Sequence, residues 1–218
     1  MVENGKLSDI AKKAIAGMLT LAPSLTSFGN TVPISYLRLV PHQEAPTNVC
    51  WGDRNRSVLI RVPLGWLNAD NMSQNANPME KKSKTSYESN QTVEFRGPDG
   101  SADIYLLLAG MAVASRHGLQ MKDSLNIAKR LYVDVNIFHD EYKHIQCKLP
   151  QLPTSCWESA ERLLKDRAIY EKESVFSPIL IDGLVNILKG YDDKDLNEKY
   201  QGNEGQIRNL SDVYLHCA

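Results

Sequence analysis

The stretch RLVPHQEAPTNVCWGDRNRSVLIR, from Arg38 to Arg61, decides how this chain folds. It places four arginines and one glutamate within 24 residues, beside a short apolar run that is typical of a strand. Arginine carries a planar, permanently charged group whose donors suit carboxylates and phosphates. Arginines at this density therefore predict an anion site. They are Arg38, Arg54, Arg56 and Arg61, and the glutamate is Glu44.

The predicted strand has apolar side chains at alternate positions from Val58 to Val62, which indicates one buried face. Arg61 belongs to the opposite face. Arg56 has the opposite parity from Arg61, so an ideal strand would separate the two side chains. They can share one site only if Arg56 stands at the strand entrance, bent by the turn from Gly52 to Asn55. Spacing alone leaves that convergence open.

A second predicted strand, in QTVEFRGP, separates its two faces more clearly. Thr92, Glu94 and Arg96 share one face, while Val93 and Phe95 share the other. Glu94 and Arg96 then lie about 6.6 Å apart along the strand, at a rise of about 3.3 Å per residue. One face can pack while the other does chemistry. The two charges on that face are equally consistent with a simple ion pair.

Two helices are predicted around these strands. Ser8 or Asp9 can cap a helix with helical apolar spacing that we expect to stop at Pro23. Residues 104–113 are apolar nearly all round, which predicts a helix buried on several sides that supports the site. From Pro153 onward the pattern is helical.

Composition limits the kinds of partner. Lys plus Arg total 25 and Asp plus Glu total 26, so no global basic field favours nucleic acid. Four widely spaced cysteines suit reduced cytosolic thiols. No signal sequence and no apolar run of about 18 residues is present, which predicts a soluble, cytoplasmic protein without membrane contact. The cysteines are Cys50, Cys147, Cys156 and Cys217.

The order of the motifs resembles the glutamine synthetase family. The family pattern Tyr-x-Arg-Leu-Val-Pro-x-x-Glu-Ala-Pro, then Arg-Asn-Arg-Ser, then Ile-Arg-x-Pro, is reproduced from Tyr36 to Pro63. VEFRGPDGSADIYLLLAGMAVA is similar to the family's Glu-x-Arg-x-Pro-Asp segment and its following helix. The resemblance extends roughly from Leu7 to Lys189.

The resemblance implies an α+β fold, with antiparallel strands of a glutamine synthetase-type catalytic domain packed on helices and a helical C-terminal third. It implies that residues 1–218 are the C-terminal portion of that domain. The family's N-terminal β domain and first metal-binding segments do not precede Leu7. Residues 64–91 are polar and lack periodicity, and we expect a mobile insertion loop there.

The resemblance also implies roles for the arginines. Arg38 and Arg96 would bind the substrate glutamate through its carboxylate. Arg56 and Arg61 would bind the phosphates of ATP, and Arg56 would also act catalytically on the transferring phosphoryl group. Arg54 has two interpretations, a contact to the anion or a brace for the turn.

Two glutamates complete the implied site. Glu94 would be a ligand of Mg²⁺ or Mn²⁺. Glu44 would lie on a flap that closes the site and would take a proton from ammonium, so that neutral ammonia can attack. The implied partners are glutamate, ammonia and ATP, and the parent protein would be a ringed homo-oligomer.

Three functions remain open at this point. The leading one is the C-terminal catalytic region of an ATP-dependent glutamate-ammonia ligase, acting through a γ-glutamyl phosphate and inactive as this isolated chain. A γ-glutamyl-amine ligase uses the same acyl phosphate with another amine. A non-catalytic structural or regulatory homologue keeps the scaffold alone, although retention of Glu44 speaks against it.

Overall fold

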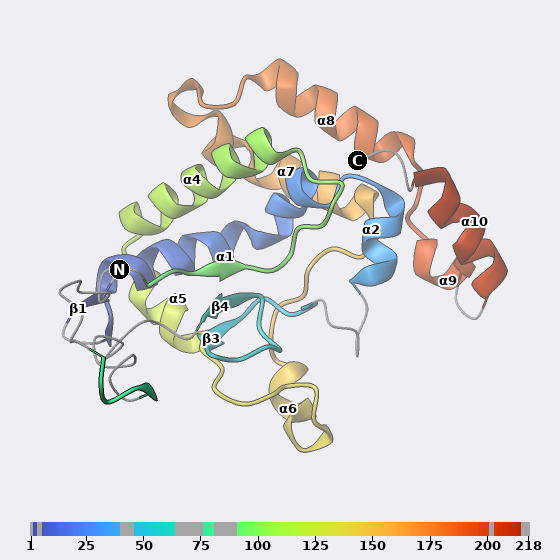
Figure 1. Ribbon diagram of the computed structural model, residues 1–218. Helices are drawn as coiled ribbons and strands as arrows, with labels where there is room; N and C mark the ends of the chain where they lie inside the picture. The colour runs from blue at the N-terminus through green and yellow to red at the C-terminus, as the bar shows by residue number, and fades with distance from the viewer. Residues whose placement is uncertain are drawn as a thin grey trace.

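A computed structural model of the chain describes residues 2–3, 6–39, 46–63, 76–80, 91–200 and 203–214. Helices surround a small sheet, and the strands lie beneath α1 in Figure 1. The strands are β1 (Val2–Glu3), β2 (Lys6–Leu7), β3 (Trp51–Asp53), β4 (Ile60–Val62) and β5 (Glu94–Phe95). The α-helices are α1 (Asp9–Gly29), α2 (Pro33–Arg38), α4 (Ile104–Gln120), α5 (Ser124–Arg130), α6 (Lys143–Gln146), α7 (Cys156–Glu171), α8 (Pro178–Gly190), α9 (Leu196–Tyr200) and α10 (Glu204–Tyr214).

Helix α1 begins where the sequence predicts and ends later. The Ser8 hydroxyl accepts a hydrogen bond from the backbone N–H of Ala11 at 3.2 Å, which confirms the cap. The expected stop at Pro23 is wrong, because the helix continues to Gly29. A proline removes one backbone donor and strains the preceding turn. That loss is offset by burial, since Leu25 and Phe28 beyond it are fully buried.

Helices α1 and α4 cross with their backbones in close approach. A Cβ added at Gly17 would lie 2.0 Å from the carbonyl oxygen of Ala114. A Cβ at Gly118 would lie 2.1 Å from the carbonyl oxygen of Lys13. Only glycine fits at either position. This contact seats α4 against α1, as Figure 1 shows.

Helix α4 is less enclosed than its composition predicts. Its face toward α1 is buried at Val113 and Ala114. Ile104, Tyr105 and Leu108 are 66%, 88% and 59% exposed, so the expectation of burial on several sides is wrong. The described residues cover only one side of this helix.

The sheet confirms the α+β class but is mixed. β4 pairs antiparallel with β5, as expected, whereas β3 pairs parallel with β4. Residues 54–59 lie outside the sheet and lead the chain back to the start of β3. β4 therefore runs in the same direction as β3, and Trp51 pairs with Ile60. Arg54 begins this excursion with a left-handed φ of 56° and donates its N–H to the Val62 carbonyl at 2.8 Å. The C-terminal third is helical, as predicted.

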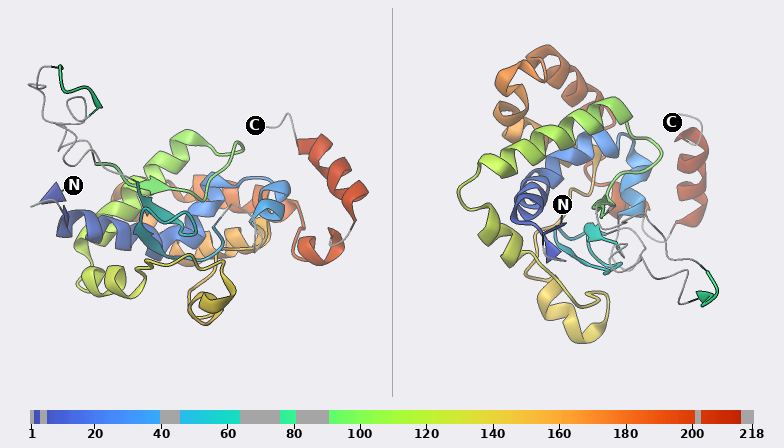
Figure 2. Two further views of the ribbon diagram at one scale, coloured as in Figure 1. Left: turned by 60° about the horizontal axis from the view of Figure 1, so that its bottom comes forward. Right: turned by 60° about the vertical axis from the view of Figure 1, so that its left-hand side comes forward.

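Two apolar clusters hold these layers together. The main one joins α1, α4, α7 and α8 to the sheet, and its rings include the mutually packed Phe28, Tyr170 and Phe176. A smaller one lies behind the sheet and contains Cys50, Val58, Val133 and Ile137. One face of the sheet thus packs on the main cluster, and Figure 2 shows the surrounding helices from two further directions.

Two regions named in the sequence analysis fall outside this description. Within the expected loop at 64–91, the structure describes residues 76–80 and 91 alone, so the loop stays a prediction. Glu44 also lies outside the described residues. Among the described residues, no helix has the length and apolar character needed to cross a membrane.

The glycine contact generates a stability prediction. Gly17→Ala forces α1 and α4 apart, and we expect it to lower the free energy of unfolding by about 1–3 kcal/mol. Gly183→Ala is the matched control, because this glycine also lies inside a helix but has no atom within 4 Å of its added Cβ. It should be neutral or stabilise by up to about 1 kcal/mol. Urea unfolding of both variants measures the difference, and equal stabilities would contradict the close approach.

Candidate functional site

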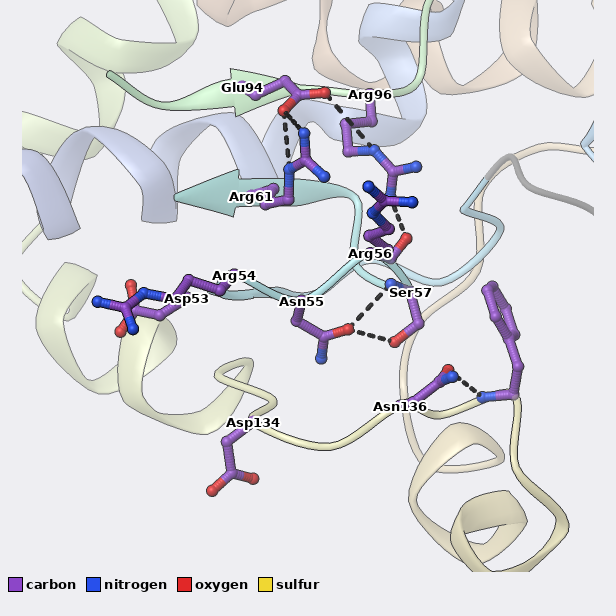
Figure 3. Close-up of a pocket in the computed structure, with 11 residues that line it drawn as sticks. Asp53, Arg54, Asn55, Arg56, Ser57, Arg61, Glu94, Arg96, Asp134 and Asn136 are labelled. Carbon is purple, nitrogen blue, oxygen red and sulfur yellow. Dashed lines mark hydrogen bonds and ion pairs between the residues drawn. The ribbon is translucent and has the colours of Figure 1, made fainter. Parts of the chain in front are cut away.

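A pocket of about 690 Å³ opens at the edge of the sheet. Figure 3 shows that its wall comes from three segments. Residues 53–61 run from the end of β3 through the turn to Arg61 of β4, and residues 94–96 bring Glu94 of β5 and Arg96 directly after it. The segment after α5 supplies Asp134, Asn136 and Phe138. The pocket therefore collects Arg54, Arg56, Arg61 and Arg96, four of the five arginines that the sequence singles out.

An ion pair links the two motif strands. The β4–β5 register places Arg61 opposite Glu94. Nη2 and Nε of Arg61 lie 2.6 Å and 2.8 Å from Oε2 of Glu94. Nε of Arg96 lies 3.7 Å from Oε1 of the same carboxylate. Glu94 thus contacts two arginines at once, as Figure 3 shows.

Arg96 also braces the turn that carries Arg56. Its Nη1 donates to the backbone carbonyl of Arg56 and, at 3.2 Å, to that of Val58. A guanidinium has donors in a fixed plane, so one side chain can hold two carbonyls and a carboxylate together. Arg96 therefore joins β5 to the turn before β4.

The turn resolves the parity problem of the sequence. Arg56 sits outside the regular strand, in the excursion that separates β3 from β4, and it is exposed at the pocket. Arg61 is half-buried on β4. The two side chains line one pocket despite their opposite parity, because the chain bends where it enters β4.

Two residues of this turn were missed by the sequence reasoning. Asn55 and Ser57 are buried, and they alternate with the exposed Arg54 and Arg56. The Nδ2 of Asn55 donates to the Val133 carbonyl, and its Oδ1 accepts from the N–H and the hydroxyl of Ser57. The signal in the sequence was the alternation of small polar residues with arginines in Arg-Asn-Arg-Ser.

Arg38 is not among the residues that line the pocket. It ends α2 and donates from Nη2 to the carbonyl of Gly97 at 2.6 Å, one residue beyond Arg96. Its Nε lies 3.9 Å from Asp99 and is buried without a hydrogen-bond partner within the described part of the chain. The structure therefore brings Arg38 to the start of the loop after β5, with one unsatisfied donor.

The described residues do not form a divalent-cation site by themselves. No group of three or more His, Cys, Asp or Glu side chains gathers within the described ranges. Asp53 and Asp134 also line the pocket, and Glu94 itself is held by two arginines. Mg²⁺ and Mn²⁺ require several oxygen ligands.

The fold and the pocket together define an α+β domain that gathers arginines from adjoining strands in one pocket. The family model described as glutamine synthetase, catalytic domain, matches residues 2–204. The chain belongs to this family. The match confirms the resemblance drawn from the motifs.

Curated relatives agree. The chain is 34% identical to a glutamine synthetase of Pyrococcus abyssi over 166 residues, covering 76% of this chain and 32% of that protein. It is 33% identical to one of Mycobacterium tuberculosis over 176 residues, covering 81% of this chain and 32% of that protein. The chain thus spans about a third of the length of these relatives.

Solved structures share the fold. One described as a novel glutamine synthase homolog aligns with a TM-score of 0.59 and 20% identity, covering 95% of this chain and 39% of that one. Apo GmaS without ligand aligns with a TM-score of 0.62 and 19% identity, with the same coverages. At this identity the likeness concerns the fold alone.

A thiol behind the pocket provides a pH-dependent prediction. Burial raises the pKa of the Cys50 thiol to about 12, whereas Cys147 is exposed. Because the thiolate is the reactive form, we expect iodoacetamide at about pH 8 to alkylate Cys147 and to spare Cys50 in the folded chain. Labelling of Cys50 should rise only as the pH approaches about 12, or in urea. Peptide mass spectrometry measures both sites, and equal labelling of the folded chain would contradict the burial of Cys50.

Proposed function

We propose that this chain is the C-terminal portion of the catalytic domain of an ATP-dependent ligase that joins glutamate to ammonia. The observation that carries the proposal is the convergence of Arg56, Arg61 and Arg96 in one pocket of a glutamine synthetase-family domain. Membership of the family implies ATP and a divalent metal ion in general. The specific reaction, a cytoplasmic location and a ringed homo-oligomer are parts of the proposal.

The proposed chemistry explains the choice of arginine. A carboxylate is a poor electrophile, so the γ-phosphoryl group of ATP is first moved to the side-chain carboxylate of glutamate. Ammonia then attacks the acyl carbon, and phosphate leaves with the electron pair of the broken carbon–oxygen bond. Arg56 and Arg61 would bind the phosphates and offset the charge that is spread over the phosphoryl oxygens during transfer.

The proposed contacts to glutamate and ammonium involve Arg38 and Glu44. Arg38 has an unsatisfied Nε near the loop that follows Arg96, which supports a shared role in binding the glutamate carboxylate. Glu44 would take the proton from ammonium. Its position lies outside the described residues, so this role rests on the motif alone.

Glu94 binds two arginines of the pocket in this structure. It holds Arg61 and Arg96 on one carboxylate, so an arriving phosphate would compete with Glu94 for these arginines. A metal role for Glu94 stays a prediction of the family resemblance.

A second candidate is a γ-glutamyl-amine ligase. It stays open because both candidates need the same sites for glutamate and phosphate and differ in the amine. A non-catalytic homologue is the third reading. It would keep the scaffold without requiring a nucleotide to bind.

Nucleotide binding tests the phosphate assignment. We expect calorimetric titration of the chain with MgATP to show binding, and Arg56→Ala and Arg61→Ala each to weaken it by about tenfold or more. A hydrogen bond to a charged group contributes about 1.5–3 kcal/mol, and each 1.4 kcal/mol is tenfold in affinity. Arg162→Ala is the control, since this arginine lies on α7, outside the pocket lining, and forms an ion pair with Glu158 at 3.3 Å. Equal weakening by the control would remove the support for this pocket.

Activity of the isolated chain tests the proposed division of the site. We expect no glutamine from the purified chain supplied with glutamate, ammonium and MgATP, because no three metal-binding side chains gather among the described residues, where a metal-assisted transfer needs several oxygen ligands. Chromatographic detection of glutamine with time measures it. Steady glutamine formation that disappears in Arg56→Ala would refute the proposal that this chain is incomplete.

A further inference from the structure

The turn that carries Arg54 and Arg56 is attached to the segment that forms the opposite wall of the pocket. β3 already lies beside this segment, because Trp51 donates its N–H to Leu131 at 3.0 Å and accepts from Val133 at 2.8 Å. A Cβ added at Gly52 would lie 2.1 Å from the Val133 carbonyl oxygen. Strand and wall are thus in direct backbone contact before the turn begins.

Asn55 extends this attachment into the turn with its side chain. Its Nδ2 donates to the carbonyls of Val133 at 3.2 Å and Val135 at 2.7 Å. Its Oδ1 accepts the N–H of Ser57 at 2.9 Å and the hydroxyl of Ser57 at 2.7 Å. The Ser57 hydroxyl oxygen then accepts the N–H of Ile137 at 3.2 Å. The network is closed, because both donors of the amide and its oxygen are used.

The chemistry of this network selects asparagine. The position needs two donors toward carbonyls and one acceptor toward an N–H and a hydroxyl, and a short primary amide provides all of them. Aspartate has the same shape but would set a carboxylate against two carbonyl oxygens. Alanine would leave the two carbonyls and the Ser57 donors without partners in a buried place.

The network determines where the neighbouring arginines point. Asn55 and Ser57 are buried, so Arg54 and Arg56 must face outward into the pocket. Arg96 holds the other side of the same turn through the Arg56 carbonyl. The turn is therefore clamped between β5 and the wall segment, and Figure 3 shows Asn55 between them.

We propose that Asn55 is a positioning residue, which sets Arg56 for its phosphate and couples it to the pocket wall at Asp134 to Phe138. The inference rests on the proposed function, because a phosphate is the ligand that Arg56 would receive. It adds a residue that touches no substrate and acts through its two bonded segments.

The affinity for MgATP, compared between variants that lose similar stability, tests this role. We expect Asn55→Ala and Asn55→Asp to weaken MgATP binding by about tenfold or more in calorimetric titration, since a misplaced guanidinium loses its charged hydrogen bonds. Asn48→Ala is the matched control. Asn48 is also a buried asparagine that donates to a distant carbonyl, of Gln146 at 3.3 Å, and it does not line the pocket. A merely structural role would lower the urea midpoint in both alanine variants and leave their affinities alike.

Hydrogen exchange separates this inference from the proposed function. In Asn55→Ala we expect faster exchange in residues 54–57 and 133–137, with unchanged exchange in α1. Wild-type affinity in the Asn55 variants would overturn the inference and leave the proposed function standing. Absence of MgATP binding in the wild-type chain would overturn the phosphate role of Arg56. Hydrogen exchange alone would then test whether Asn55 couples the turn to the pocket wall. Faster exchange in both segments supports the coupling, and unchanged exchange overturns it.

Discussion

The antiparallel pairing of β4 with β5 is the constraint on which the site depends. It sets Arg61 opposite Glu94, so two motifs that are 33 residues apart in the chain meet on one sheet face. A shift of the register by one residue would turn every side chain of one strand to the other face. Arg61 would then face the core, and Arg96 would no longer reach the Arg56 carbonyl. Register, ion pair and pocket are therefore one arrangement.

Strands this short cannot hold that register alone. β4 and β5 contain three and two residues, and isolated pairs of such strands are at best marginal in water. The helices provide the missing free energy by burial. Ile60 and Phe95 pack on the main cluster, and α1 anchors that cluster through its close contact with α4. The site thus depends on packing that begins at Gly17, far from any arginine.

Features that repeat within one helix or strand can be predicted from the sequence. Features that depend on contacts between distant segments cannot. The faces of Arg61 and Glu94 follow from strand alternation, and both are confirmed. The helix end expected at Pro23 is wrong, because the burial of later residues offsets the missing backbone donor. Local helix propensity does not include that burial. The hydrogen bonds of Asn55 cannot be predicted from local pattern, because its partners lie about 80 residues away, at 133 and 135. The contact of Arg38 with the Gly97 carbonyl likewise joins residues 59 positions apart, which no local pattern predicts.

The weakness of the Arg61–Glu94 pair is compatible with the proposed binding of a phosphate by Arg61. Its side chains are 25% and 41% exposed, and ion pairs this accessible to water contribute only about 0–1 kcal/mol. A polyphosphate offers more negative charge and several acceptor oxygens, so it can outcompete one carboxylate. Until it arrives, Glu94 reduces the mutual repulsion of Arg61 and Arg96, which lie on the same carboxylate. The pair therefore keeps the cationic pocket assembled without binding the arginines too tightly to release them.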